Sequence, residues 1–255
     1  MLTLNQTHEK SATPAEASPI LSAAAVHLWW FSLRPTDCLE TAIALLSHDE
    51  QQRGGRLRHP LAAQRFYLGR AMLRIILGEY LHLPPQHLQF AYTSNGKPYV
   101  PEARHIAFSL AHAGEVGLLA IACQRRVGVD VELTNRPTNW QHLARRCLPA
   151  PAYQAFQALP DQLQAMSWLW VCHEAFLKAR GEASLRRLLR IDLPWHETCT
   201  GYASHFTMQD VLGQTWLVRD VSREGTRAAL VVEGVPDADV EISIFDRRLE
   251  QRPLP

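Results

Sequence analysis

The pattern of hydrophobic and polar positions predicts helices followed by strands, and this order occurs twice along the chain. Residues 26–33 begin the first half with an aromatic and β-branched segment that is typical of a strand. Two helices then precede a group of strands, and Pro84 and Pro85 end the longer helix. The predicted helices span 37–46 and 61–82, and the predicted strands span 87–93, 105–110, 117–123 and 126–133.

The second half repeats this order. Its predicted helices span 140–148, 161–180 and 184–190, and its predicted strands span 202–209, 215–221, 227–233 and 240–245. Between the halves, Asn135, Arg136 and Pro137 interrupt the pattern. We therefore predict an α+β fold of two similar lobes, an N-terminal lobe at 26–134 and a C-terminal lobe at 135–255.

Composition excludes some classes of function. The 255 residues carry a formal net charge of +1, with 47% hydrophobic and 20% charged residues, as in an ordinary globular protein. The small net charge excludes a strongly polycationic or polyanionic role for the whole molecule, so attraction to phosphates or acidic partners must come from local clusters. We expect no nucleic-acid partner, and two equivalent lobes are compatible with a monomer.

The amino-terminal segment and the cysteines bear on location. Residues 1–25 are rich in Ser, Ala, Thr and Pro and lack the basic start and apolar core of a signal peptide, so we predict a flexible tail. Apolar stretches elsewhere, such as 116–123, are shorter than the roughly 20 residues that span a bilayer. The cysteines are odd in number and lack close metal-type spacing; they are Cys38, Cys123, Cys147, Cys172 and Cys199. We expect a cytoplasmic protein without a membrane partner.

Two acids share one face of the predicted strand at 127–132. Alternation along a strand places Asp130 and Glu132 opposite the valines that flank them. The two acids lie about 6.6 Å apart along the strand, a spacing that can hold one hard cation between them. Mg²⁺ prefers a few carboxylates together with phosphate oxygens and water. The same alternation also occurs in ordinary strands that expose one face to solvent.

A second pair lies on the predicted helix at 161–180. Glu174 and Lys178 are four residues apart and share a face, where a carboxylate could complete a metal site and an ammonium could bind a phosphate. A surface ion pair has the same spacing. Trp168, Trp170 and Phe176 flank the pair, which indicates that this part of the helix is partly buried.

A basic segment precedes these acids. No acidic residue lies between Gln51 and Gly78, and guanidinium groups suit phosphate oxygens. The arginines of this segment are Arg53, Arg56, Arg58, Arg65, Arg70 and Arg74. Arg65 and Arg74 are nine residues apart and point to opposite sides of a helix, so the arginines cannot form a single patch.

Two short loops carry further candidates. The turn at 95–99 exposes the amine of Lys97, and Gly96 allows a ligand to approach the backbone closely. The segment at 108–114 ends a strand with His112, which can donate a hydrogen bond to a phosphate. A histidine at a strand end is also common in purely structural roles.

Taken in order, four of these segments resemble motifs of the 4′-phosphopantetheinyl transferase superfamily. The likeness is closer to the two-lobed, broad-specificity type that activates nonribosomal peptide, polyketide and related synthases. Residues 96–99 are similar to its GKP loop, and 108–114 to its F-x-x-S-H-S-G segment. Residues 128–132 are similar to its G-[VI]-D-[VI]-E strand, and 170–181 to its W-x-x-K-E-A-x-x-K-x-x-G helix. Each motif is weak alone, but four in this order are specific.

The resemblance implies a pseudo-twofold arrangement of the two lobes, with the active site in the cleft between them. There the 4′-phosphopantetheine arm of coenzyme A would pass to a serine of an acyl or peptidyl carrier protein, with release of 3′,5′-ADP. The resemblance assigns Mg²⁺ to Asp130, Glu132 and Glu174, with Mn²⁺ as the other candidate. Lys178 would contact the diphosphate. Glu174 or a metal-linked water would take the proton from the serine.

The resemblance also implies contacts with the rest of coenzyme A. Lys97 and its loop would face the adenine end, His112 the phosphates, and two arginines the 3′-phosphate. The residues implied to bind coenzyme A are Arg53, Arg65, Gly96, Lys97, Pro98, His112 and Lys178.

The chain departs from the family motifs at two positions that matter here. Ala111 stands where the motif has a serine before its histidine, so one hydroxyl is missing. His173 stands where the motif has a lysine before its glutamate. We expect neighbouring carboxylates to raise the pKa of His173, so that its imidazolium does part of a lysine's electrostatic work.

Two other functions fit the same residues. A metal-dependent nucleotide phosphohydrolase could also use three acids and several arginines. A protein that binds coenzyme A or a carrier without catalysis is the reading that Ala111 and His173 favour. Consumption of coenzyme A in the presence of a carrier domain separates all three.

Overall fold

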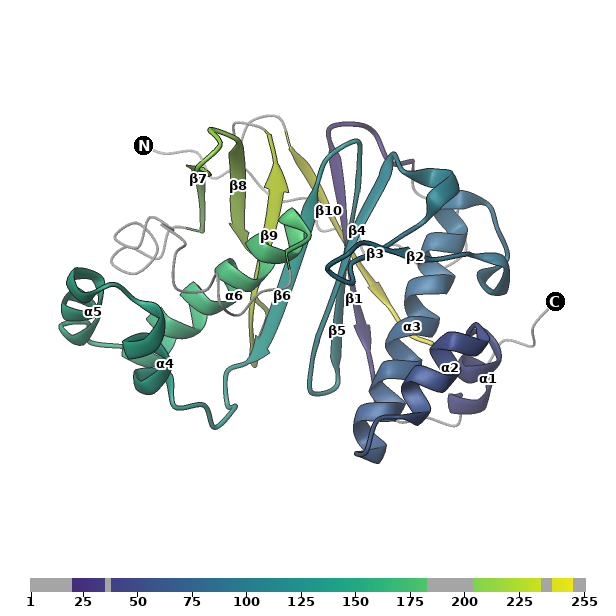
Figure 1. Ribbon diagram of the computed structural model, residues 1–255, viewed down its shortest axis with the longest axis horizontal. Coiled ribbons are helices and arrows are strands. Elements are labelled where there is room, and N and C mark those ends of the chain that lie inside the picture. Colours follow the sequence, from purple (N-terminus) through teal and green to yellow (C-terminus); the bar gives the residue numbers. More distant parts are fainter. Residues whose placement is uncertain (1–19, 35–37, 183–203, 235–239, 250–255) are drawn as a thin grey trace.

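The computed structural model describes residues 20–34, 38–182, 204–234 and 240–249 and arranges them around two four-stranded sheets (Figure 1). The α+β class and the two-part organisation predicted from the sequence are confirmed. The predicted helix at 184–190 and most of the predicted tail lie outside the described residues. None of the helices in the described ranges is long and apolar enough to cross a membrane.

The first sheet has the strand order β10-β1-β5-β4. Its strands are β1 (Ala25–Ser32), β4 (Ile106–Ala113), β5 (Val116–Cys123) and β10 (Glu241–Arg247). Strand β5 is antiparallel to both β1 and β4, whereas β10 is parallel to β1. The helices α1 (Leu39–Ala44), α2 (His48–Gly55) and α3 (Pro60–Leu81) lie on one face, and β2 (Ala91–Tyr92) with β3 (Pro98–Tyr99) forms a separate hairpin.

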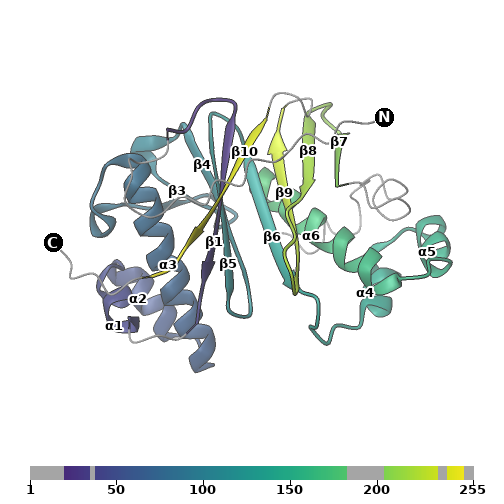
Figure 2. The same ribbon diagram turned by 180° about the vertical axis from the view of Figure 1, so that it is seen from behind.

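The second sheet is antiparallel, with the order β6-β9-β8-β7. Its strands are β6 (Val127–Leu133), β7 (His205–Gln209), β8 (Thr215–Asp220) and β9 (Thr226–Glu233). Helix α6 (Gln162–Arg180) packs along β6 and β9, and α4 (Trp140–Cys147) and α5 (Ala150–Gln157) pack against α6. The helices of each part lie on the outer side of its sheet (Figure 2).

Side-chain alternation along β1 explains why the two sheets pack against each other. Trp29 and Phe31 point to one face and join the core beneath α3. Leu28 and Trp30 point to the other face and join a third core, between the sheets. That core also receives alternate residues of β6, including Val129. Both faces of β1 are therefore buried, as its continuous apolar sequence indicates.

Sheet membership does not follow the order of the chain. Strand β6 precedes residue 134 but lies in the second sheet, and β10 is the last strand but lies in the first sheet. The lobe boundary at 134/135 therefore remains a proposal. Strand β6, before this boundary, pairs with a strand after it, and β10, after the boundary, pairs with a strand before it. Other differences are local. The strand predicted at 87–93 is reduced to β2, and helices α2 and α5 were not predicted from the sequence.

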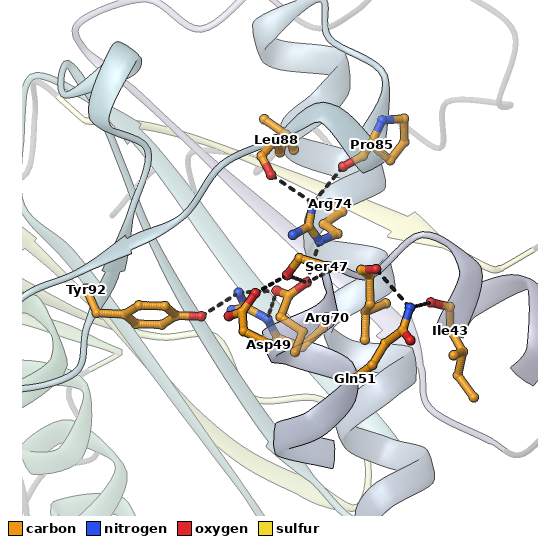
Figure 3. A network of polar contacts seen from close by, with 11 residues as sticks. Ile43, Ser47, Asp49, Gln51, Arg70, Arg74, Pro85, Leu88 and Tyr92 are labelled. Carbon is orange, nitrogen blue, oxygen red and sulfur yellow. Dashed lines mark hydrogen bonds and ion pairs between the residues drawn. The ribbon is translucent and has the colours of Figure 1, made fainter. Parts of the chain in front are cut away.

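A buried carboxylate ties α2 to α3 (Figure 3). Glu50 is 2% exposed, and its two oxygens accept hydrogen bonds of 2.6 Å from Nε of Arg70 and Nε of Arg74. Arg74 also donates to the carbonyls of Pro85 and Leu88, at 2.9 Å each. Two arginines of the basic segment are therefore structural, because both bind the carboxylate of Glu50 inside the lobe.

We expect Glu50→Ala to lower the free energy of unfolding by about 3–5 kcal/mol, because it leaves two buried guanidinium groups without their anion. Urea unfolding followed by circular dichroism measures the change. Glu40→Ala, on the exposed side of α1, is the matched control and should change stability by less than about 0.5 kcal/mol. Equal midpoints for the two variants would contradict this role of Glu50.

His27 is buried beside Tyr80 and is held in its neutral form. Trp29 Nε1 donates to the Tyr80 hydroxyl at 3.0 Å, and Nδ1 of His27 forms a hydrogen bond of 2.6 Å with the same hydroxyl. Burial lowers the pKa of His27 to about 4.

The free energy of unfolding should therefore fall as the pH falls. Between about pH 6.5 and pH 4 the unfolded chain binds a proton at His27 that the folded chain does not, so stability is highest above pH 6.5. From pH 7 to pH 5 the loss from this residue should be about 2 kcal/mol. Urea unfolding of the wild type and His27→Gln at both pH values tests this. Between the two pH values, the free energy of unfolding of His27→Gln should fall by about 2 kcal/mol less than that of the wild type. Equal falls in the two proteins would contradict the role of His27.

Candidate functional site

The site forms where the backbone of α6 lies directly on β6. A Cβ atom on Gly128 would lie 2.0 Å from the carbonyl oxygen of Ala175 and 2.4 Å from the backbone nitrogen of Ala179, so only glycine fits. Helix α6 begins at Asp161, whose side chain accepts from Gln164 N, and ends at Gly181, with φ of 70°. The contact at Gly128 brings the polar residues of the two elements together.

Asp130 and Lys178 meet across this contact. Lys178 Nζ donates to Asp130 Oδ1 at 2.7 Å. Asp130 is 7% exposed, and burial raises its pKa although the charge and hydrogen bond of Lys178 act in the opposite direction. The second oxygen, Oδ2, is buried and accepts no hydrogen bond from the residues that the structure describes. A buried carboxylate oxygen without a donor is an unusual feature that a ligand can explain.

Glu132 and Glu174 lie near this pair. Glu174 is partly buried, and burial, the charge of Asp130 and the charge of Glu132 raise its pKa, whereas Lys178 lowers it. Glu132 binds Arg136 through both carboxylate oxygens, at 2.7 Å each. The three acids that the sequence analysis singled out are therefore close enough to influence one another.

The arrangement does not by itself form a metal cage. Across the described ranges, no three His, Cys, Asp or Glu side chains are placed so that they could hold a metal ion directly. Lys178 occupies one oxygen of Asp130, and Arg136 occupies Glu132. The donor set nevertheless fits a hard divalent cation, because it consists of carboxylate oxygens with one buried oxygen free of hydrogen bonds.

The loop that carries Gly96 and Lys97 contacts the carboxyl end of α6. Lys97 Nζ donates to the carbonyls of Val127 at 3.0 Å and Lys178 at 2.6 Å. Burial, followed by the charges of Arg126 and Lys178, lowers the pKa of Lys97 to about 8. The expected exposed amine is therefore directed inward. Whether Lys97 contacts coenzyme A stays a prediction.

The other residues of this loop are placed as expected for a turn. Gly96 has φ of 81°, and a Cβ atom there would meet nothing within 4 Å. Pro98 lies in β3 and is half-buried. Both remain predicted contacts.

The charges of Lys178, Arg65 and Glu132 all influence His112, which relates donors from three elements to the acids. His112, at the exposed end of β4, has its pKa lowered first by partial desolvation and then by the charges of Lys178 and Arg65. Because their charges act on His112, Arg65 of α3 and Lys178 of α6 lie near its imidazole. Arg53 is exposed on α2, with its guanidinium 5.7 Å from the ring centre of Phe66. These side chains could bind phosphate oxygens.

The expectation for His173 was wrong. Its side chain is 6% exposed, and burial lowers its pKa to about 4, whereas we expected neighbouring carboxylates to raise it. The imidazole is therefore neutral near pH 7 and does not replace the charge of the lysine found in the motif. Ala111 is 3% exposed and packs in the core between the sheets.

Sequence reasoning missed Ser109. Its hydroxyl is 5% exposed and accepts a hydrogen bond of 3.1 Å from the backbone nitrogen of Val129. This bond joins β4 to β6, next to Asp130. The only signal in the sequence is a hydroxyl residue between the apolar residues Phe108 and Leu110 of the strand.

Comparisons with known proteins point to one family. Residues 32–124 match the family described as 4′-phosphopantetheinyl transferase, N-terminal, and residues 126–231 match the 4′-phosphopantetheinyl transferase superfamily. The chain is 35% identical over 163 residues to 4′-phosphopantetheinyl transferase HetI of Nostoc sp., an alignment that covers 62% of this chain and 69% of the relative.

Two further relatives are similar over shorter alignments. A putative 4′-phosphopantetheinyl transferase, slr0495 of Synechocystis sp., is 36% identical over 54% of this chain and 58% of its own length. The 4′-phosphopantetheinyl transferase psf-1 of Bacillus pumilus is 30% identical over 56% of this chain and 61% of its own length.

We expect Gly128→Ala to lower the free energy of unfolding by about 3 kcal/mol, because the new methyl group overlaps the backbone of α6, which cannot move aside like a flexible side chain. Urea unfolding measures the change. Gly55→Ala is the matched control, because its Cβ has room beside Tyr67 and alanine favours a helix, so stability should stay equal or rise slightly. A Gly128→Ala protein as stable as the control would show that α6 does not pack this closely.

Proposed function

The chain belongs to the 4′-phosphopantetheinyl transferase superfamily, and from that premise we propose that it transfers the 4′-phosphopantetheine arm of coenzyme A to a serine of an acyl or peptidyl carrier protein. The serine oxygen attacks the β-phosphorus of coenzyme A. A new oxygen–phosphorus bond forms, the bond to the leaving group breaks, and 3′,5′-ADP is released. The observation that carries the proposal is the group of three acids with Lys178 at the contact of β6 and α6.

Asp130, Glu132 and Glu174 would hold the divalent cation, which we propose is Mg²⁺. Support comes from Asp130 Oδ2, which is buried without a hydrogen bond among the described residues, and from the raised pKa of both Asp130 and Glu174. Burial is the main cause of both raised pKa values, and the neighbouring acids add to it, so a bound cation would stabilise both carboxylates in their charged form. When bound, the cation stabilises charge on the diphosphate oxygens.

Glu174 is the proposed acceptor of the serine proton. Its pKa is raised by burial and by neighbouring acids, which brings the carboxylate closer to the range of an efficient general base. Lys178 lies one turn further along α6. Its flexible ammonium has three donors, so it can keep its bond to Asp130 while it donates to a phosphate oxygen.

The remaining phosphate contacts would come from the first lobe. The charges of Arg65 and Lys178 both lower the pKa of His112, and we propose that these three side chains donate to the phosphates. A neutral His112 donates one hydrogen bond without adding charge. Arg53, Gly96 and Pro98 are the other proposed contacts with coenzyme A.

The setting of the enzyme is also a proposal. The absence of close cysteine pairs in the sequence favours a reducing compartment, so we propose that the protein acts in the cytoplasm. Since both parts of the site come from one chain, we propose a monomer.

Incubation with coenzyme A, Mg²⁺ and a panel of apo carrier domains, followed by intact mass, tests the function. We expect one carrier serine to gain one phosphopantetheine. Asp130→Asn should lower kcat/KM by about 100-fold, because it removes a charge that the phosphoryl transfer requires. Asp246→Asn, which changes an exposed acid on β10, is the matched control and should retain the wild-type rate.

The other outcomes contradict the proposal in different ways. Cleavage of coenzyme A without any gain in carrier mass would indicate a phosphohydrolase. Binding of coenzyme A without its consumption would indicate a binding protein. A wild-type rate for Asp130→Asn at limiting Mg²⁺ would remove Asp130 from the metal site.

A further inference from the structure

The hairpin of β2 and β3 holds the carboxyl end of α6 through side chains. Lys97 Nζ donates to the carbonyl of Lys178 at 2.6 Å, and Asn95 Nδ2 donates to the carbonyl of Gly181 at 2.9 Å. These bonds join residues 81 and 86 positions apart in the chain. Lys97 also donates to the carbonyl of Val127, the first residue of β6, at 3.0 Å. One ammonium therefore links the hairpin, the strand and the helix.

A buried cation stabilises a helix most strongly at its carboxyl end. The last carbonyls of α6 lack partners within the helix and carry the negative end of its dipole. Gly181 ends the helix with φ of 70°, and its backbone nitrogen donates to the carbonyl of Lys178, which thus accepts two hydrogen bonds. The stem of Lys97 passes over this glycine, since a Cβ atom on Gly181 would lie 3.8 Å from Lys97 Cδ.

The surroundings of the Lys97 ammonium favour its bonds to the backbone carbonyls over a bond to a ligand. Within the described part of the chain, no carboxylate forms an ion pair with Lys97, and the charges that affect it are those of Arg126 and Lys178. The partial negative charges of two backbone carbonyls therefore stabilise the charge of the Lys97 ammonium. A lysine that binds a phosphate at the surface is expected to have an exposed ammonium, whereas the ammonium of Lys97 points into the protein.

We propose that Lys97 is a positioning residue that fixes the carboxyl end of α6 and thereby holds Lys178 opposite Asp130. This inference rests on the transfer function proposed above. Lys178 supplies both the carbonyl that Lys97 binds and the ammonium that binds Asp130. Glu174 lies one turn earlier on the same helix. Loss of the bonds from Lys97 would therefore loosen the segment that carries the reacting groups, without removing any of them.

Hydrogen–deuterium exchange of the protein without substrates tests the structural half. In Lys97→Met, the amides of Gly181 and Glu182 should exchange about tenfold faster, because the bond to the Lys178 carbonyl and the bond that ties this turn to Val127 of β6 are both lost. Lys97→Arg should restore most of the protection, since a guanidinium can donate to both carbonyls. Arg248→Met, which removes an exposed cation, is the control and should leave exchange unchanged.

Kinetics test the catalytic half. Lys97→Met should lower kcat about tenfold and leave KM for coenzyme A within twofold, and Lys97→Arg should recover part of kcat. A raised KM with unchanged exchange at Gly181 would overturn the proposal and make Lys97 a contact with coenzyme A. Unchanged kcat with faster exchange would overturn it as well.

A third measurement keeps this inference separate from the proposed function. Acylation of the Lys178 amine by a small reagent, read by peptide mass, should be about tenfold faster in Lys97→Met if Lys178 is no longer held by Asp130. This result does not depend on any transfer activity. If Lys97→Met fails to fold, Asn95→Ala removes the neighbouring bond from an exposed side chain. Acylation of Lys97→Gln, which keeps a side-chain donor without the charge, then replaces the test on Lys97→Met, and a wild-type rate at Lys178 together with wild-type exchange at Gly181 in both variants would overturn the proposal.

Discussion

The close approach of α6 to β6 at Gly128 is the constraint on which the site depends. The helix backbone lies where a side chain would otherwise be, so the elements are separated by no more than a glycine and the small residues Ala175 and Ala179. Since the backbones touch, polar side chains two positions along the strand and one turn along the helix come within hydrogen-bond distance. Asp130 and Lys178 meet for that reason. A larger residue at position 128 would move every group on α6 relative to every group on β6.

Buried charge decides which arginines of the basic segment remain available for ligands. Glu50 takes Arg70 and Arg74 into the first lobe, where each guanidinium also lies over the ring of Phe90. Arg65 lies earlier on α3, and its charge lowers the pKa of His112. One helix thus provides a structural ion cluster on one side and a candidate phosphate contact on another. The helical period predicts that Arg65 and Arg74 point apart, but it cannot identify the acid that neutralises Arg74, because that acid lies on a different helix.

The parts of the site that follow from local periodicity could be predicted from the sequence. Alternation placed Asp130 and Glu132 on one strand face, and the helical repeat placed Glu174 and Lys178 together. Contacts between distant segments could not be predicted in this way. The inward direction of Lys97 depends on the end of α6, and the parallel pairing of β10 with β1 depends on the return of the chain to the first sheet. The error for His173 has a related origin, since the flanking aromatic residues indicated only partial burial of this helix, and burial of the imidazole itself lowers its pKa.

The neutral state of His173 has a consequence for the charge balance of the site. The family motif has a lysine at this position, so this chain has one positive charge fewer beside Glu174. Burial, with a smaller contribution from the neighbouring acids, raises the pKa of Asp130 and of Glu174, so a nearby cation would stabilise both carboxylates. The cations that are present come from separate elements: Lys178 from α6, Arg136 from the segment after β6 and Arg65 from α3. A site with its acids on two adjoining elements and its cations on three therefore requires both lobes to be in place, which is why the packing of β6 against the first sheet matters for chemistry as well as for stability.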